Sequence, residues 1–219
     1  MKRKIIVTSD GSSTLYLPDL NEHYHSTNGA IQEAYHVYIK NGLDTIESNE
    51  VTVLEIGFGT GLNCFISFLE AANKVIHYVG VEAYPVTLDE VAQLNYVTEL
   101  KASKEKAVFN KMHSVAWEEA HQLAANFWLT KRQQFFKDIC YEACFDIIYF
   151  DAFGPEKQPD LWTEAIFKKM YEALKPNGLL VTYASKGLVK RAMRSVGFKV
   201  KRLPGPPGKW HMLQAVKEG

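Results

Sequence analysis

Three glycines flanked by two carboxylates are the residues in this sequence whose types and spacing most directly indicate chemistry. Gly57, Gly59 and Gly61 alternate with other residues. Glu55 lies two positions before the first glycine, and Glu82 ends the next apolar run. Glycine permits a tight turn and lets the backbone approach a ligand, because no Cβ stands in the way. The pattern predicts a cofactor-binding turn between a strand and a helix.

The spacing of these glycines argues against a nicotinamide dinucleotide. The dinucleotide fingerprint is G-x-G-x-x-G, whereas this turn reads G-x-G-x-G and has Leu62 where the third dinucleotide glycine would stand. The helix that starts behind the turn has unpaired N–H groups at its first residues, which can bind a ligand. We therefore expect a cofactor other than a nicotinamide dinucleotide.

A third carboxylate, Asp151, is the candidate catalytic group, with Phe153 two positions later. Both follow the apolar run 145–150, which we expect to be a central strand. Open α/β sheets bind ligands outside the carboxyl ends of their strands, so both side chains should face the same crevice as Gly57 and Glu82. Taken alone, the carboxylate is equally compatible with capping a turn or a helix.

The elements that must position these residues alternate between strand and helix. Apolar and β-branched residues predict strands over 51–56 and 75–81, with a helix over 62–72 between them. Further strands are expected over 107–112, 133–136, 145–150 and 179–183, and an antiparallel pair over 198–202 and 211–216. Further helices are expected over 85–100, 117–129, 162–174 and 185–195.

The first 45 residues form an expected accessory to this α/β unit. Apolar runs at 5–7 and 14–17 predict a short hairpin, and Asn28 can cap a helix that stops at Gly42. We expect this accessory, residues 1–45, to cover the cofactor or substrate pocket. The whole chain of 219 residues is then a single domain, with its core over residues 46–219.

Composition excludes several classes of protein. No apolar run approaches membrane-spanning length, and the apolar stretch near the N-terminus is too short for a secretory signal, so we expect a cytoplasmic protein. Cys140 and Cys144 lack the second ligand pair of a structural zinc site, and His23 and His25 lack a third ligand. We expect no metal.

Basic residues are concentrated toward the C-terminus, although the net charge of the whole chain is zero. Such asymmetry points to an anionic partner or, equally, to a solvated surface. The basic residues from Ala184 onward are Lys186, Lys190, Arg191, Arg194, Lys199, Lys201, Arg202, Lys209 and Lys217.

A longer motif adds a resemblance to a known family. The run Asp151–Trp162 resembles the D-x-F-x-P-x-K-x-P-x-x-W signature of the MnmC-type tRNA methyltransferases. Further matches are Asn28-Gly29 with Glu33, and the run Gly205-Pro206-Pro207-Gly208-Lys209 with Met212. The sequence departs from the family at Trp210-His211, where relatives usually have Arg-Glu.

The resemblance implies a class I methyltransferase fold that binds S-adenosyl-L-methionine (SAM). This fold is a Rossmann-like, mostly parallel, seven-stranded sheet with an antiparallel C-terminal strand. By resemblance, the turn holds the methionine part of SAM, Glu55 helps to hold its amino group, Glu82 holds the ribose hydroxyls and Asp138 is the candidate for the adenine amino group. The expected cofactor-binding residues are Glu55, Gly57, Phe58, Gly59, Gly61, Asn63, Glu82 and Asp138.

The resemblance also implies a reaction, methyl transfer to the amine of 5-aminomethyl-(2-thio)uridine at the tRNA wobble position. Asp151 would orient the amine and stabilise its developing positive charge, and Phe153 would stack on the extruded uridine. The expected tRNA-binding residues are Lys186, Lys190, Arg191, Arg194 and Lys209. Bifunctional family members carry a flavin-dependent oxidase domain as well. We expect a stand-alone methyltransferase that depends on a separate enzyme for its aminomethyl precursor.

Two other functions are compatible with the sequence. A small-molecule amine N-methyltransferase or a polyamine aminopropyltransferase shares the sheet and places an acid after the same strand, although a second acid soon after Asp151 is missing from the turn. A non-catalytic RNA-binding module on this fold is the other alternative. Tight SAM binding without methyl transfer to any tRNA would favour the second.

Overall fold

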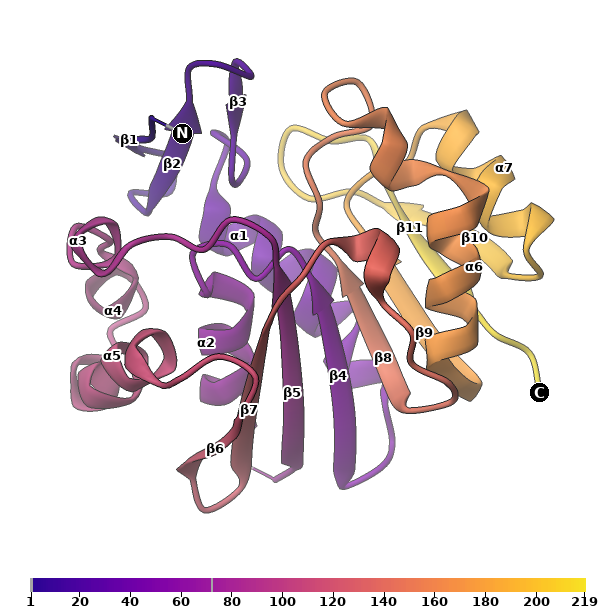
Figure 1. The fold of residues 1–219 in the computed structure, drawn as a ribbon. Helices are drawn as coiled ribbons and strands as arrows, with labels where there is room; N and C mark the ends of the chain where they lie inside the picture. The colour runs from indigo at the N-terminus through magenta and orange to yellow at the C-terminus, as the bar shows by residue number, and fades with distance from the viewer. Residues whose placement is uncertain (1, 72) are drawn as a thin grey trace.

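The computed structural model describes residues 2–71 and 73–219 and has an eight-stranded sheet at its centre (Figure 1). The strand order is β10-β11-β9-β8-β4-β5-β7-β6. These strands are β4 (Glu50–Ile56), β5 (Val75–Glu82), β6 (Ala120–Ala124), β7 (Phe127–Gln133), β8 (Phe145–Phe150), β9 (Leu174–Thr182), β10 (Lys199–Pro204) and β11 (His211–Val216). Seven of them form the expected sheet, with β11 antiparallel to both neighbours, and β6 adds an antiparallel edge.

Strand β4 lies between β5 and β8, and both pairings are parallel. The apolar and β-branched residues of β4 suit a strand that is buried on both faces. Because the three strands are in register, Glu55 near the end of β4 lies opposite Gly80 on one side and Tyr149 on the other. The carboxyl ends of β4, β5 and β8 therefore meet at one edge of the sheet, where the sequence placed its candidate residues.

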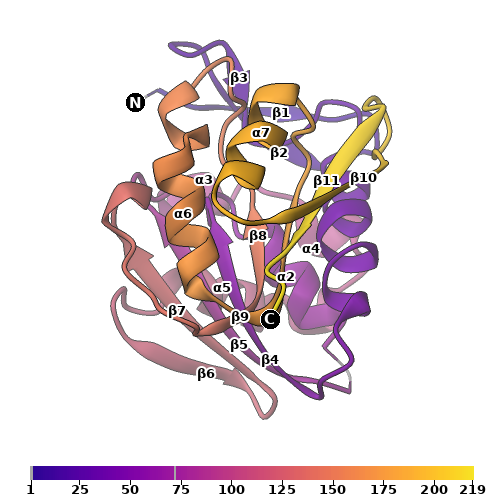
Figure 2. The same ribbon diagram turned by 90° about the vertical axis from the view of Figure 1, so that its right-hand side faces the viewer.

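Helices cover both faces of the sheet, and Figure 2 shows α6 and α7 on the opposite side from α2. The two resulting hydrophobic layers contain Phe65, Phe109 and Tyr149 on one face and Phe150, Phe167 and Met193 on the other. The first layer is covered by α1 (Ala30–Ala34), η1 (Tyr35–Lys40), α2 (Leu62–Leu69), α4 (Tyr96–Glu99) and α5 (Lys106–Ser114). The second is covered by η4 (Phe136–Asp138), α6 (Glu164–Ala173) and α7 (Gly187–Ser195).

The N-terminal residues form a separate small sheet of β1 (Lys4–Val7), β2 (Ser13–Leu17) and β3 (Glu22–His23). The predicted hairpin is confirmed, because β1 and β2 pair antiparallel, and β3 extends it. Asn95 ties this sheet to the core: its side-chain oxygen accepts from the N–H of Ser13 at 2.7 Å, and its Nδ2 donates to the carbonyl of Gly11 at 2.8 Å. In Figure 1 the small sheet stands above the carboxyl ends of the central strands.

Four sequence predictions were wrong. Residues 133–136, predicted as a strand, contain only the last residue of β7 and the first residue of η4. The residue that precedes α1 as its N-cap is Gly29, not Asn28, and it makes no side-chain capping bond.

The other two errors concern residues 107–129. Residues 107–112 lie in helix α5, because Phe109 and Met112 are spaced by three residues and both are buried against the core, as a helix requires. Residues 117–129, predicted as a helix, contain β6 and the start of β7. Phe127, Leu129 and Lys131 alternate with more exposed residues, which is the period of a strand.

Other boundaries shift by smaller amounts. The predicted helix over 85–100 is divided into α3 (Leu88–Val91) and α4, separated around Asn95 where its side chain bonds to the small sheet. Helix α2 ends at Leu69, and position 72 of the predicted helix lies outside the described residues. The remaining short helices are η2 (Leu43–Thr45), η3 (Ser103–Glu105) and η5 (Pro159–Trp162). Within residues 2–71 and 73–219, none of the helices has the length and apolar character needed to span a membrane.

Candidate active site

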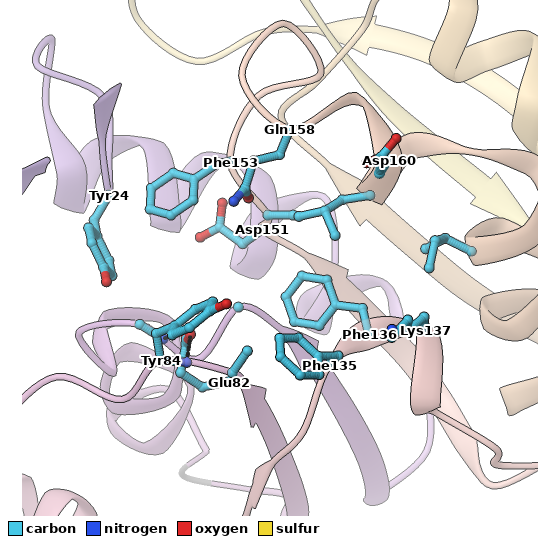
Figure 3. A pocket seen from close by; sticks show the side chains of 16 residues that line it. Tyr24, Glu82, Tyr84, Phe135, Phe136, Lys137, Asp151, Phe153, Gln158 and Asp160 are labelled. Atoms are coloured by element: carbon cyan, nitrogen blue, oxygen red, sulfur yellow. Dashed lines mark hydrogen bonds between the residues drawn. The ribbon is translucent and has the colours of Figure 1, made fainter. Parts of the chain in front are cut away.

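A cavity of about 370 Å³ lies at the carboxyl ends of β4, β5 and β8. Its volume is within the usual range for a small-molecule site. Figure 3 shows Asp151, Phe153 and Tyr24 on one side of the cavity. Glu82 and Tyr84 lie on the other side. The lining comes from several elements: Tyr24, Gly57, Gly59, Glu82, Ala83, Tyr84, Phe135, Phe136, Lys137, Asp151, Ala152, Phe153, Gln158, Asp160, Leu161 and Ile166.

The glycine turn forms part of the cavity wall and requires its glycines. Gly57, Gly59 and Gly61 have φ angles of 93°, 50° and 72°, in the left-handed region that favours glycine. A Cβ on Gly57 would lie 2.7 Å from the backbone oxygen of Asp151. A Cβ on Gly59 would lie 3.0 Å from the ring of Tyr24. The turn therefore packs directly on the segment that carries the candidate catalytic carboxylate.

Glu82 presents its carboxylate at the same wall. Its Oε2 accepts from the N–H of Gly59 at 3.0 Å, and its Oε1 accepts from the N–H of Tyr84 at 2.9 Å. Each carboxylate oxygen has a second lone pair, so the fixed group can still accept from two hydroxyls of a ribose. This arrangement fits the nucleoside part of SAM.

Next to Glu82, apolar side chains form a slot that suits a flat ring. Tyr84 and Phe135 are 53% and 49% exposed, and their rings meet edge to face with centroids 6.0 Å apart. Phe136, Leu161 and Ile166 line the space beside them. Large aromatic side chains that stay half exposed around a cavity are suited to packing on an adenine.

Asp151 is half-buried at the cavity wall, and a side chain of helix α2 holds its carboxylate. Its Oδ2 accepts from Asn63 Nδ2 at 2.8 Å. Burial raises the pKa of Asp151 to about 6, and the nearby carboxylate of Glu33 acts in the same direction, while Tyr38, Asn63 and Lys209 lower it. At neutral pH the group is mainly a carboxylate, ready to accept a hydrogen bond from an amine.

The segment after Asp151 is held by two hydrogen bonds to its backbone. Trp162 Nε1 donates to the carbonyl of Phe153 at 2.8 Å, and the hydroxyl of Tyr183 donates to the carbonyl of Ala152 at 2.8 Å. The rings of Phe153 and Tyr24 meet edge to face, with centroids 5.1 Å apart. The signature tryptophan therefore fixes the turn that presents both the carboxylate and an aromatic wall.

Four predicted cofactor residues do not line the cavity: Glu55, Phe58, Gly61 and Asn63. Glu55 is fully buried, and its Oε1 accepts from Asn63 Nδ2 at 2.9 Å. Phe58 packs in the core, where a Cβ on Gly80 would approach its ring within 2.4 Å. Gly61 begins helix α2.

Asp138 is also outside the cavity lining. It is exposed in η4, whereas the preceding residues Phe135, Phe136 and Lys137 do line the cavity. The contact of Asp138 with adenine stays a prediction.

The predicted tRNA-binding residues occupy two places. Lys186 immediately precedes α7 and forms an ion pair with Glu156 of the signature run. Arg191 and Arg194 are exposed further along the helix. Lys190 is half-buried on the same helix. Lys209 lies apart from them, in the loop between β10 and β11.

Lys209 lies close enough to Asp151 to act on the charge of its carboxyl group. It forms an ion pair with Glu33, and its Nζ lies 3.8 Å from the ring centroid of Tyr183. Glu33 itself is buried, and its charge acts on Asp151. A loop near the C-terminus and a helix near the N-terminus thus meet beside Asp151.

Sequence reasoning missed the residues that surround Asp151 from other elements. Tyr24, Tyr38 and Tyr183 carry no motif of their own; they reach the site only because the accessory and the end of β9 fold around it. Tyr84 and Phe135 could have been found, since each closely follows a strand that ends at the site. Among residues 2–71 and 73–219, no three His, Cys, Asp or Glu side chains gather as a metal site requires.

Comparison with known families identifies one match. Residues 95–218, more than half of the chain, match a family profile described as S-adenosyl-L-methionine-dependent methyltransferase. This region contains Asp151 and the whole signature run but not the glycine turn.

Curated relatives share sequence over almost the whole chain. The tRNA 5-methylaminomethyl-2-thiouridine biosynthesis bifunctional protein MnmC of Cupriavidus necator is 28% identical over 216 residues, which is 91% of this chain and 32% of that protein. The protein of the same name from Campylobacter fetus subsp. fetus is 30% identical over 219 residues, 93% of this chain and 34% of that protein. The chain spans about a third of the length of these relatives.

Solved structures share the fold. The crystal structure of MNMC2 from Aquifex aeolicus superimposes with a TM-score of 0.78 at 23% identity, covering 100% of this chain and 71% of that one. Spermidine synthase from Thermotoga maritima gives a TM-score of 0.57 at 17% identity, covering 99% of this chain and 74% of that one.

Proposed function

The chain belongs to the S-adenosyl-L-methionine-dependent methyltransferase family, and we propose that it methylates the amine of 5-aminomethyl-(2-thio)uridine at the tRNA wobble position. The observation that carries this proposal is the contact between the cofactor turn and the catalytic segment, where Gly57 packs on the backbone of Asp151. A carboxylate is thereby fixed beside the site of the methyl donor. The names of the curated relatives, which specify 5-methylaminomethyl-2-thiouridine biosynthesis in tRNA, support the substrate.

The chain's own residues supply binding, orientation and charge. SAM brings an electrophilic methyl group on a positively charged sulfur. Gly57 and Gly59 line the cavity and would border the methionine part, and Glu82 would accept from the ribose hydroxyls. Asp151 accepts a hydrogen bond from the substrate amine, aims its lone pair and stabilises the positive charge that develops on nitrogen. The rings of Tyr24 and Phe153, which meet edge to face beside Asp151, reduce access of water to the amine.

The acceptor side of the cavity suits a base that is turned out of an RNA loop. Phe153 and Tyr24 offer aromatic faces and edges beside the carboxylate, and single-stranded bases are bound by stacking and edge contacts. The basic residues of α7 start at the same edge of the sheet, where Lys186 pairs with Glu156. We assign Lys186, Lys190, Arg191 and Arg194 to the route of the anticodon stem. The aminomethyl precursor would come from a separate enzymatic activity.

Methylation of defined tRNA tests the proposal. The protein is incubated with labelled SAM and tRNA from a strain that lacks this methylation, and the nucleosides are then separated. We expect label in 5-methylaminomethyl-(2-thio)uridine and none in tRNA that already carries the methyl group. Label in a free polyamine or another small amine, with tRNA unlabelled, would refute the tRNA substrate and favour the small-molecule alternative.

A further inference from the structure

One buried side chain joins two carboxyl groups beneath the cofactor turn. Asn63, the second residue of α2, is 3% exposed. Its Nδ2 donates to Glu55 Oε1 at 2.9 Å and to Asp151 Oδ2 at 2.8 Å. Both hydrogens of the amide group are therefore used, one toward the end of β4 and one toward the residue that follows β8.

The backbone fixes the position of Asp151 relative to the end of β4 independently of this amide. The N–H of Asp151 donates to the carbonyl of Ile56 at 2.9 Å, which continues the pairing of β4 with β8 past the end of the strands. Gly57 packs on the carbonyl of Asp151 so closely that no Cβ fits between them. The distance between the ends of β4 and β8 is thus set by the main chain, and the amide of Asn63 spans it.

Glu55 has no surface from which to contact a ligand. It is 0% exposed and does not line the cavity, in contrast to Glu82, which does. Its Oε2 and the Oδ1 of Asn63 have no hydrogen-bond partner among the described residues. The hydroxyl of Tyr78 lies beside Glu55 but outside hydrogen-bonding geometry.

We propose that Glu55 and Asn63 are positioning residues for the acceptor side of the reaction: Glu55 holds the Asn63 amide, and that amide holds the carboxylate of Asp151 in the orientation that receives the substrate amine. Glu55 and Asn63, which flank the glycine turn in the sequence, then act on Asp151. The glycines of the turn and Glu82 act on the cofactor. This inference rests on the proposed role of Asp151.

The bond from Asn63 also stabilises the charged form of Asp151. Burial raises the pKa of this carboxyl group to about 6, and the Asn63 amide opposes that rise. Loss of the amide should raise the pKa further, because the carboxylate would lose a donor that the protonated form needs less. The other charged and titratable groups near Asp151 come from the accessory, the core and the C-terminal loop: Glu33, Tyr38, Glu55, Tyr96, Tyr183 and Lys209.

The test compares pH profiles of methyl transfer. Asn63→Leu removes both amide bonds at similar volume, and we expect the acidic limb of the kcat/KM profile to move upward by about 0.5 to 1.5 pH units. We expect the rate at pH 7 to fall about 10- to 100-fold, while SAM affinity by calorimetry stays within about threefold. Ser67→Ala is the matched control, because Ser67 lies one turn later on α2 and is buried. Among the described residues, its hydroxyl bonds to the Tyr149 hydroxyl alone, at 3.2 Å.

A second pair of variants separates loss of the hydrogen bond from loss of folding. Glu55→Gln retains an oxygen that can accept from Asn63, whereas Glu55→Leu does not. We expect Gln to restore most of the rate that Leu loses, and the acidic limb to shift with Leu and not with Gln. Circular dichroism confirms that the compared variants are folded.

Two results would overturn the inference. A loss of SAM affinity in Asn63→Leu and Glu55→Leu as large as that in Glu82→Ala, with an unmoved acidic limb, would make them cofactor ligands. Folded variants with lower rates but an unmoved acidic limb and unchanged SAM affinity would make them packing residues only. Retention of full activity by Asp151→Asn is a different outcome, since it would refute the proposed role of Asp151 itself.

Discussion

At the scale of single residues, two carboxylates in one cavity differ in what surrounds them. Glu82 accepts from two backbone N–H groups, which fix the orientation of its side chain at the cavity wall. Asp151 accepts from a buried amide and lies close to the carboxylate of Glu33. The first arrangement suits a carboxylate that accepts hydrogen bonds from hydroxyls. In the second, burial raises the pKa of Asp151 to about 6, close to the pH at which a carboxyl group can exchange a proton with a substrate.

Glu82→Ala should weaken SAM binding. Loss of a hydrogen bond to a charged group costs about 1.5 to 3 kcal/mol, which corresponds to a roughly 10- to 100-fold rise in Kd. Calorimetry with SAM measures it, and Asp89→Ala, an exposed acid on α3, is the control. Unchanged affinity in Glu82→Ala would show that the ribose binds elsewhere.

Asp151→Asn should stabilise the fold in a pH-dependent way. The pKa of Asp151 is raised from 3.8 in the unfolded chain to about 6, so the folded state binds the proton more tightly and stability falls as pH rises from about 4 to about 6. An amide resembles the protonated acid and avoids this loss. We expect the variant to exceed the wild type by about 1 to 2 kcal/mol in urea unfolding at pH 8 and by little at pH 4.5. A difference that is the same at both pH values would contradict the raised pKa.

At the scale of elements, the site is closed by segments from opposite ends of the sequence. Lys209 in the β10–β11 loop pairs with Glu33 of α1, and Gly208 approaches Asn28 so closely that a Cβ would lie 2.0 Å from its Nδ2. The N–H of Gly205 donates to the carbonyl of Trp210 at 3.1 Å, which closes the loop on itself. The loop is therefore fixed between the accessory and the sheet.

Trp210→Ala should weaken binding of tRNA. The side chain is 91% exposed on this fixed loop and follows Lys209, so it can present a ring to an unpaired base. Stacking of a base on an aromatic side chain is worth about 1 to 3 kcal/mol, so Kd should rise roughly 5- to 100-fold in a filter-binding assay. Trp210→Phe should retain most of the affinity, and SAM binding should not change. Equal affinity of wild type and Trp210→Ala would exclude this contact.

The sequence was most informative where one strand leads directly into one turn. The glycine turn, Glu82 and Asp151 could be placed from their positions after apolar runs, because parallel strands end at a common edge. The tyrosines around Asp151 could not, since Tyr24, Tyr38 and Tyr183 reach it through tertiary packing alone. Over residues 107–129 the sequence analysis predicted a strand where the structure has a helix, and a helix where it has strands. The apolar residues there are too few to distinguish the helical period from the alternation of a strand.

At the scale of the whole molecule, the net charge of the chain is zero, but residues 184–219 are strongly basic. Helix α7 begins next to the edge of the sheet that presents Asp151 and carries Lys190, Arg191 and Arg194, and Lys186 precedes it. Such a local basic surface can guide a tRNA toward the cavity, although the protein as a whole does not attract anions.

Replacing Arg191 and Arg194 together by Gln should weaken tRNA binding and flatten its salt dependence. For every phosphate that the variant no longer neutralises, the slope of log affinity against log salt should become shallower by roughly 0.7 to 0.9, because fewer counterions are released. Lys104→Gln with Lys106→Gln, two exposed lysines around the start of α5, is the control with the same charge change. An unaltered slope in the arginine variant would place the tRNA on another face.

The most direct test of the catalytic role of Asp151 is single-turnover methyl transfer to tRNA by Asp151→Asn, measured alongside SAM affinity. We expect SAM to bind within about threefold of wild type while the methylation rate at pH 7.5 falls by about 10² to 10³, the range for loss of one group that stabilises developing charge. A variant that methylates tRNA at the wild-type rate would contradict the central claim that Asp151 is the carboxylate that receives the amine.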